Sequence, residues 1–158
     1  LSGNWISQDE SLKETLVRQF QKTVGKDASF KLGKITGKYT VSVSPDLTKL
    51  TAAWEEWKMD STTTRGERSV TLSVSVDGTQ EYEILQIVDG KNPKMRKIEI
   101  KLIEDKTASQ SFFEGIKMRT KVDLPALGSG HWSLHEETFY LQGSGQETAW
   151  KFIPHPAE

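Results

Sequence analysis

The chain has 158 residues, a formal net charge of −1 and no cysteine. This length suits one domain, residues 1–158, which can bury roughly two-thirds of its unfolded surface. The near-neutral charge argues against a nucleic-acid partner, for which a basic surplus is typical. The absence of cysteine excludes disulfides, thiolate metal sites and cysteine nucleophiles. No phosphate-binding glycine loop is present, and we expect no cofactor. No serine lies in a Gly-X-Ser-X-Gly elbow, so no hydrolase nucleophile is predicted.

No apolar run approaches the roughly 18–20 residues that span a bilayer, so we expect no transmembrane segment. The sequence begins LSGNW, without Met and without a signal-peptide pattern. Such a start is compatible with a chain trimmed from a longer precursor, which would make the protein secreted or periplasmic. The sequence alone leaves the compartment undetermined.

The first long element is SLKETLVRQFQKTVG, residues 11–25. Its apolar residues recur every three to four positions, which predicts one amphipathic helix near the N-terminus. Ser7, Asp9 or Ser11 could cap its start, and Gly25 is well placed to end it. The apolar side of this helix must cover one end or one face of a sheet.

Alternating apolar and polar residues predict β-strands along the rest of the chain. In 69–76 the valines and Leu72 share one face, and the Asp-Gly pair at 77–78 predicts a hairpin turn into a strand over 79–88. In 111–123, alternation places an apolar set on the core side, formed by Phe112, Ile116, Met118 and Val122. Further strands are expected over 37–44, 97–104 and 147–154.

The stretch SPDLTKLTAAWEEWKMD, residues 44–60, has two interpretations. As a helix, it is capped by Ser44 and lines one side with Trp54 and Trp57. As part of a sheet, Pro-Asp forms a type I turn and 50–59 is a strand. We favour the strand, although simple alternation then places Trp54 and Trp57 on opposite faces.

About eight to nine strands joined mostly by short turns predict a mainly β protein, built as an antiparallel meander. Closure into a barrel removes the exposed sheet edges, and the single helix can cover one end. A β-sandwich is the competing arrangement. We favour the barrel because the strands are long and the helix comes early.

The tetrapeptide SGNW, residues 2–5, precedes the predicted helix. Its Gly-X-Trp triplet, followed by a helical segment after the first strand, resembles the calycins, the superfamily of lipocalins and fatty-acid-binding proteins. The resemblance implies a lipocalin-like barrel that holds a small apolar molecule. It also implies that Trp5 packs across the base of the barrel and that Gly3 allows the chain to approach closely.

The segment GHWSLHEETFY, residues 130–140, concentrates histidine, glutamate and aromatic residues. On a strand, His131 and His135 lie about 13 Å apart, too far to share one zinc ion, so we expect no metal site. Alternation predicts one inner face, formed by Trp132, Leu134, Glu136, Thr138 and Tyr140. Glu136 in that position, with His135 beside it, is the candidate acid or base. An exposed glutamate near the barrel mouth is the alternative.

The alternating basic residues Lys117, Arg119 and Lys121 also have two interpretations. They could hold an anionic head group, or they could form a solvated outer face paired with acidic neighbours. We favour the solvated face, because the apolar residues of the same segment have the opposite phase.

These patterns predict a protein that binds a small hydrophobic molecule inside the barrel, by burial of apolar surface. The candidate lining residues are Trp5, Phe20, Tyr39, Trp54, Val74, Ile100, Ile116, Met118, Trp132 and Tyr140. Two alternatives remain open. One is a cofactor-independent isomerase or cyclase that uses Glu136 or His135, and the other is a structural domain that docks a partner through an exposed apolar patch.

Overall fold

The computed structural model describes residues 1–92, 96–118, 127–143 and 149–155. This part of the chain contains one helix, α1 (Asp9–Val24), and ten strands. The strands are β1 (Gly3–Ser7), β2 (Ser29–Val43), β3 (Lys49–Arg65), β4 (Arg68–Val88), β5 (Lys97–Asp105), β6 (Ala108–Phe113), β7 (Ile116–Lys117), β8 (Gly130–His135), β9 (Thr138–Gly143) and β10 (Trp150–Pro154). The prediction of a mainly β, antiparallel protein with one N-terminal helix is confirmed.

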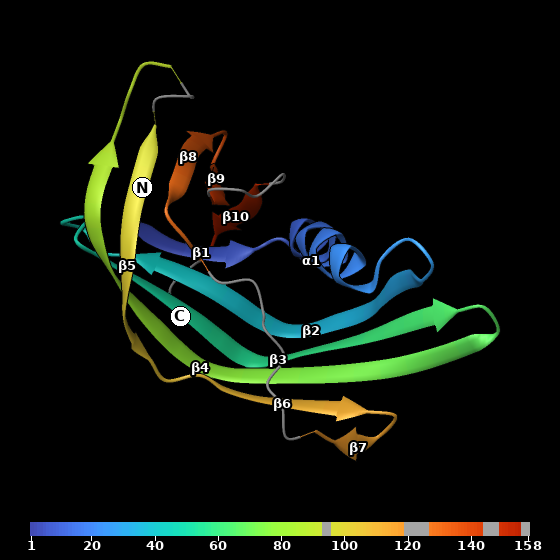
Figure 1. Ribbon diagram of the computed structural model, residues 1–158. Helices are drawn as coiled ribbons and strands as arrows, with labels where there is room; N and C mark the ends of the chain where they lie inside the picture. Colours follow the sequence, from blue (N-terminus) through green and yellow to red (C-terminus); the bar gives the residue numbers. More distant parts are fainter. Residues whose placement is uncertain (93–95, 119–126, 144–148, 156–158) are drawn as a thin grey trace.

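All strands belong to one antiparallel sheet with the order β3-β2-β1-β10-β9-β8-β5-β4-β6-β7. β3 also pairs with β4, so eight of the strands form a ring of hydrogen-bonded neighbours. The first and last strands are adjacent in this ring, since Trp5 lies opposite Pro154 and Ser7 opposite Phe152. We call these eight strands, β1 to β5 and β8 to β10, the ring (Figure 1).

The junction between β5 and β8 is the shortest pairing in the ring. Within the described ranges, two residue pairs form it, Lys97 with His131 and Ile98 with Gly130. The Ser129 hydroxyl continues the ladder by one step, because it accepts from the Ile100 N–H at 2.9 Å and lies 3.2 Å from the Ile100 carbonyl oxygen, to which it donates. The Ser129 side chain thus makes the two hydrogen bonds to Ile100 that the backbone of a further paired residue would make.

Ser129→Ala is therefore expected to lower the free energy of unfolding by about 1–2 kcal/mol, since it leaves both backbone groups of Ile100 without their partner. Urea unfolding would measure the change, and hydrogen exchange would locate it at the Ile100 amide. Ser133→Ala, on the neighbouring strand β8, is the control. Equal effects of the two substitutions would contradict this role for Ser129.

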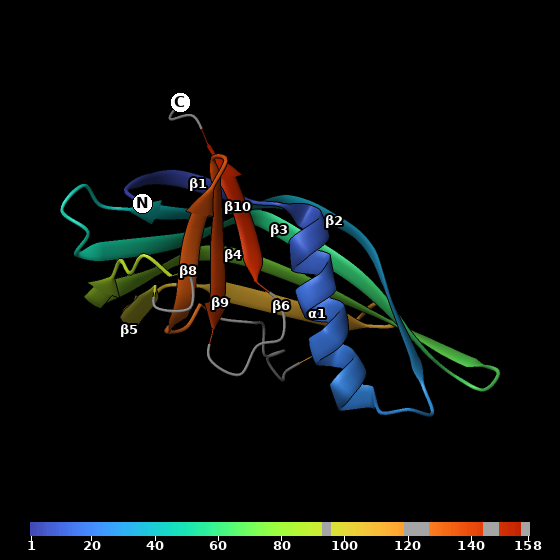
Figure 2. The same cartoon turned by 90° about the horizontal axis from the view of Figure 1, so that it is seen from above.

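Three long strands extend beyond the ring. The outer halves of β2, β3 and β4, together with β6 and β7, form a second region of the same sheet that we call the extension. Figures 1 and 2 show α1 lying across β2 on the side toward which the sheet curves. The helix packs against β2 and β10, and its Leu12 and Leu16 side chains are buried there.

The long strands bend where the ring meets the extension. Gly37 and Gly78 both have positive φ, 83° and 119°. In each case an added Cβ would lie under 3.0 Å from a backbone carbonyl oxygen, that of Glu56 on β3 for Gly37 and that of Lys106, between β5 and β6, for Gly78. Between them, Glu56 also has positive φ, and its N–H donates to the Asp77 carboxylate at 2.7 Å. Glycines that permit close backbone approach thus allow this bend.

The Asp-Gly pair at 77–78 does not form the predicted hairpin. β4 runs continuously through it from Arg68 to Val88. Gly78 provides a bend instead of a reversal, and Asp77 accepts the hydrogen bond from the bulge on β3. Period-two patterning describes both halves of β4 correctly, but it carries no information about whether the chain turns back between them.

Residues 44–60 form the favoured turn and strand. Leu47 N–H donates to the Ser44 carbonyl in the turn, and β3 follows. The pairing with β4 shifts register between Trp54 and Trp57, at a bulge. Because the bulge adds one residue, both tryptophans are buried on the same face, and the objection from alternation does not apply.

Two other details differ from the predictions. Gln8 precedes α1 without a side-chain cap, so none of Ser7, Asp9 and Ser11 has the predicted capping role, whereas Gly25 ends the helix with a φ of 82°. The segment 111–123 is not one strand, because β6 turns at 114–115 into β7. Val122 lies outside the described residues, as does the first part of the predicted strand 147–154.

Candidate binding site

A chain of aromatic side chains runs through the middle of the ring. Trp5 contacts Phe139 at a centroid distance of 5.6 Å, and Phe139 stacks on Phe152 at 5.7 Å. The ring centroid of Phe152 lies 6.2 Å from those of both Tyr39 and Trp150. All five side chains are buried, so the strands β1, β2, β9 and β10 direct them toward one another. This packing supplies much of the apolar core.

The chain of rings continues to the bend. Tyr39 lies 4.0 Å from Trp54, and Trp54 meets Trp57 edge to face at 5.1 Å. Tyr39 also meets Trp150 edge to face at 5.5 Å. The bulge on β3 brings Trp54 and Trp57 to the same side, so this group connects the ring to the extension.

Among the described residues, four buried polar side-chain atoms of this core have no hydrogen-bond partner. They are the Tyr39 hydroxyl and the indole N–H groups of Trp57, Trp132 and Trp150. The four side chains are at most 8% exposed. Buried polar groups in native proteins are usually paired with protein, water or a ligand, because an unpaired one costs about 1–3 kcal/mol. An ordered water or a ligand with acceptor atoms can pair such donors.

Two tyrosines on the inner side have raised pKa values. Burial, with a smaller contribution from the nearby Tyr82, raises the pKa of Tyr39 well above 10.0. Burial and then the negative charge of Asp105 raise the pKa of Tyr82 to about 12. The Tyr82 hydroxyl donates to the Gln80 side-chain oxygen at 3.1 Å. Both hydroxyls thus remain protonated donors at neutral pH.

The raised pKa values predict a loss of stability in alkali. Tyrosines of the unfolded chain ionise near pH 10, whereas Tyr82 in the fold ionises near 12. The contribution of Tyr82 is fully present below about pH 10 and is lost as the pH rises toward about 12. Urea unfolding across this range should show a falling free energy, and Tyr82→Phe should reduce the slope. Tyr140→Phe is the control, and the same slope in Tyr82→Phe as in the unmodified protein would contradict the prediction.

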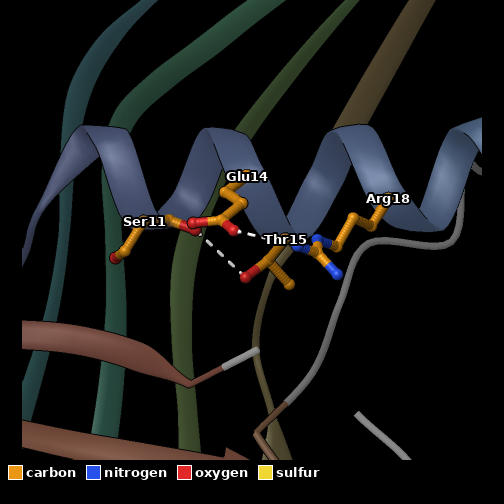
Figure 3. A network of polar contacts seen from close by, with 4 residues as sticks. All are labelled: Ser11, Glu14, Thr15 and Arg18. Carbon is orange, nitrogen blue, oxygen red and sulfur yellow. Dashed lines mark hydrogen bonds and ion pairs between the residues drawn. The ribbon is translucent and has the colours of Figure 1, made fainter. Parts of the chain in front are cut away.

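Helix α1 is joined to β10 beside the aromatic core. Gln8 N–H donates to the Lys151 carbonyl at 2.9 Å, and Lys151 N–H donates to the Ser11 hydroxyl at 3.1 Å. The Thr15 hydroxyl donates to the Ser11 carbonyl, and Arg18 pairs with Glu14 at 3.3 Å one turn further on (Figure 3). The two bonds to Lys151 fix the start of the helix relative to the ring.

An open depression of about 450 Å³ lies beside the first turns of α1. Its walls include Glu10, Lys13, Glu14 and Lys151, so both signs of charge are present. Arg18 and Glu14, which also line it, pair with each other and are about half exposed. Mixed charges of this kind are typical of a solvated surface, and we assign no ligand to it.

The structure brings half of the predicted lining residues together in the core. Buried residues among them are Trp5, Tyr39, Trp54, Val74 and Trp132, and Ile100 packs against them while partly exposed. Ile116 and Met118 are 72% and 36% exposed at the β7 end of the extension, so the prediction that they face the core is wrong. Phe20 belongs to α1, and its side chain lies outside what is described.

Residues 130–140 form a hairpin rather than one strand. β8 ends at His135, and β9 begins at Thr138 after a turn at Glu136 and Glu137, both with positive φ. The turn pairs Trp132 with Leu141 and Ser133 with Tyr140. Tyr140 therefore lies on the opposite face from Trp132, where the Lys151 ammonium approaches its ring at 5.9 Å. The prediction that Trp132 and Tyr140 share one inner face is therefore wrong, because the turn after His135 interrupts the alternation.

The candidate acid–base residues are exposed. The side chains of His135 and Glu136 are 74% and 85% exposed, and their charged ends lie 3.8 Å apart at the tip of the hairpin. Glu136 does not face inward as alternation suggested, because the turn interrupts the strand. The exposed alternative for Glu136 is the one that the structure adopts.

No group of three metal-ligating side chains occurs among the residues that the structure describes. Of the predicted basic stripe, Lys117 is exposed on β7, and Arg119 and Lys121 lie outside the described ranges. Within those ranges, no helix is both long enough and apolar enough to cross a bilayer.

Three core residues that carry the site were not singled out from the sequence. Phe139, Trp150 and Phe152 are each at most 2% exposed. Alternation within TFYLQ and WKFIP could have identified them, since the buried residues are two apart on each strand. Trp57 was weighed with Trp54 as a lining residue but is not among the candidate lining residues, because simple alternation places it on the opposite face and does not reveal the bulge. No known protein family, curated protein or solved structure matches this chain.

Proposed function

We propose that the ring closes as a lipocalin-like barrel and that the protein binds a small hydrophobic molecule on its inner side. The observation that carries the proposal is the set of four unpaired donors within an otherwise apolar, aromatic interior. Apolar walls with a few polar groups are the usual composition of small-molecule sites. The Gly-X-Trp triplet at residues 3–5 is consistent with this role.

Two steps connect the fold to the function. The walls of the ring expel water from an apolar ligand, which favours binding by roughly 25 cal/mol per Å² of buried apolar surface. The donors at the bend, from β2, β3 and β10, then orient any polar atom that the ligand carries. Helix α1, joined to β10 through Ser11, covers this side of the ring.

Extraction of the purified protein followed by mass spectrometry, with native mass spectrometry for stoichiometry, tests the proposal. We expect one apolar molecule per chain, or saturable binding of an uncharged dye such as Nile red. Trp54→Phe, a change within the aromatic core, should weaken dye binding. Ile116→Ser, at the exposed end of the extension, should leave it unchanged. Absence of any bound molecule and of saturable dye binding would end the proposal.

A second candidate function is docking of a protein partner on the extension. Leu72 on β4, Phe113 on β6 and Ile116 on β7 are successive cross-strand partners and so lie on one face. Phe113 is 44% and Ile116 72% exposed, which makes this an exposed apolar row at the edge of the sheet. Loss of dye binding in Ile116→Ser, with Trp54→Phe unaffected, would favour this candidate.

A further inference from the structure

The four unpaired groups in the core share one chemical property. An indole N–H donates and cannot accept, and a neutral tyrosine hydroxyl donates as well as accepts. Tyr39, Trp57, Trp132 and Trp150 therefore offer four donors to the interior, with no acceptor that requires a donor in return. A molecule that satisfies them must bring acceptor atoms.

Three of these donors belong to one aromatic group. The rings of Tyr39 and Trp150 meet at 5.5 Å and an interplanar angle of 68°, and Trp57 joins them through Trp54. They come from β2, β3 and β10, which are held in register by the ring and its bulge. The fourth donor, Trp132 on β8, lies beneath the Arg96 guanidinium at 5.9 Å.

None of the described cationic side chains is buried around Tyr39, Trp57 and Trp150, and the Arg96 guanidinium beside Trp132 is partly exposed and pairs with the Asp89 carboxylate at 3.6 Å. Among the residues that the structure describes, the buried polar side chains are Ser11, Thr15, Ser61 and Ser111, and none is a cation. An anion taken into such a place would lose its hydration without gaining a counterion, which is costly. A carbonyl oxygen carries no charge and accepts two hydrogen bonds, so it meets the donors without that penalty.

We propose that the interior site selects an uncharged apolar molecule with a carbonyl-type acceptor oxygen, such as a ketone, quinone or ester, received by the Tyr39 hydroxyl and the Trp150 indole N–H. This inference rests on the proposed function, since it names the ligand class of the same site. It excludes a carboxylate as the preferred ligand.

Displacement of Nile red by three matched molecules tests it: a long-chain methyl ketone, the n-alkane of equal length and the carboxylate of equal length. We expect the ketone to bind about tenfold more tightly than either, since one hydrogen bond contributes about 0.5–1.5 kcal/mol and 1.4 kcal/mol is tenfold. Tyr39→Phe should weaken ketone binding by about two- to tenfold and leave alkane binding unchanged. Tyr140→Phe, on the outer face, should change neither.

The outcomes separate the two proposals. Equal affinity for ketone and alkane, or preference for the carboxylate, would overturn the inference and leave ligand binding intact. Unchanged ketone affinity in Tyr39→Phe would overturn the role of the hydroxyl. Failure of all three molecules to displace the dye, or of the dye to bind, would remove the proposed function itself. Tyr39→Phe deletes only an unpaired hydroxyl, so the melting temperature of the ligand-free variant should not fall, and this checks its fold.

Discussion

Replacing Gly37 by alanine is expected to lower the free energy of unfolding by about 2–5 kcal/mol, from a positive-φ penalty of about 1–2 and a steric term of about 1–3. Gly37 has a φ of 83°, and its added Cβ would lie under 3.0 Å from the backbone of Glu55 and Glu56 on β3. Backbone atoms cannot rotate away as a flexible side chain can. The bend between the ring and the extension would have to open to admit the methyl group.

Gly66→Ala provides the matched control. Gly66 also has positive φ, 60°, but nothing lies within 4 Å of the position that its Cβ would take. This control should show the conformational penalty alone, about 1–2 kcal/mol. Soluble yield, circular dichroism and urea unfolding of both variants would make the comparison. Equal destabilisation of the two would mean that the close approach at the bend does not matter.

Phe152→Ala is the second change with a large expected effect. Phe152 is 0% exposed and lies within 5.7–6.2 Å, between ring centroids, of Phe139, Tyr39 and Trp150. Truncation would leave a cavity in the centre of the aromatic chain, and buried Phe→Ala changes cost about 3–5 kcal/mol. Guanidinium unfolding measures the loss, and near-ultraviolet circular dichroism reports the packing of the neighbouring rings.

The adjacent residue provides the control for this change. Ile153 is 38% exposed on the other face of β10, and Ile153→Ala should cost less than about 1 kcal/mol. Similar losses in the two variants would show that the inner face of β10 is not the centre of the core.

Fold class and the helix could be predicted from the sequence because each depends on local periodicity. The stripe in 11–25 and the alternation in 69–76 reflect one element each, and both elements form. Asp-Gly at 77–78 misled because a glycine serves equally well in a reversal and in a bend, and the choice depends on which strand lies opposite. Glu136 and Glu137 misled in the other direction, since a turn of two glutamates carries no glycine signal.

The candidate site was predictable only in part, because local periodicity does not reveal which strands lie opposite each other. Tyr39 and Trp132 follow from alternation, whereas Trp57 becomes an interior residue through a bulge on β3 that pairs against β2 and β4. The shortage of partners for the four donors is a property of the assembled core. It arises from what surrounds each atom, and no pattern along the chain records it.

The adjacency of β1 and β10 also has a consequence for biosynthesis. Asn4 and Trp5 pair with residues about 150 positions later in the chain, through the His155 N–H to the Asn4 carbonyl and the Trp5–Pro154 pair. During translation, the outer edge of β1 must wait uncovered until β10 leaves the ribosome. Such long-range pairing makes folding slow, and the waiting edge is where nascent chains would associate with one another or recruit a chaperone.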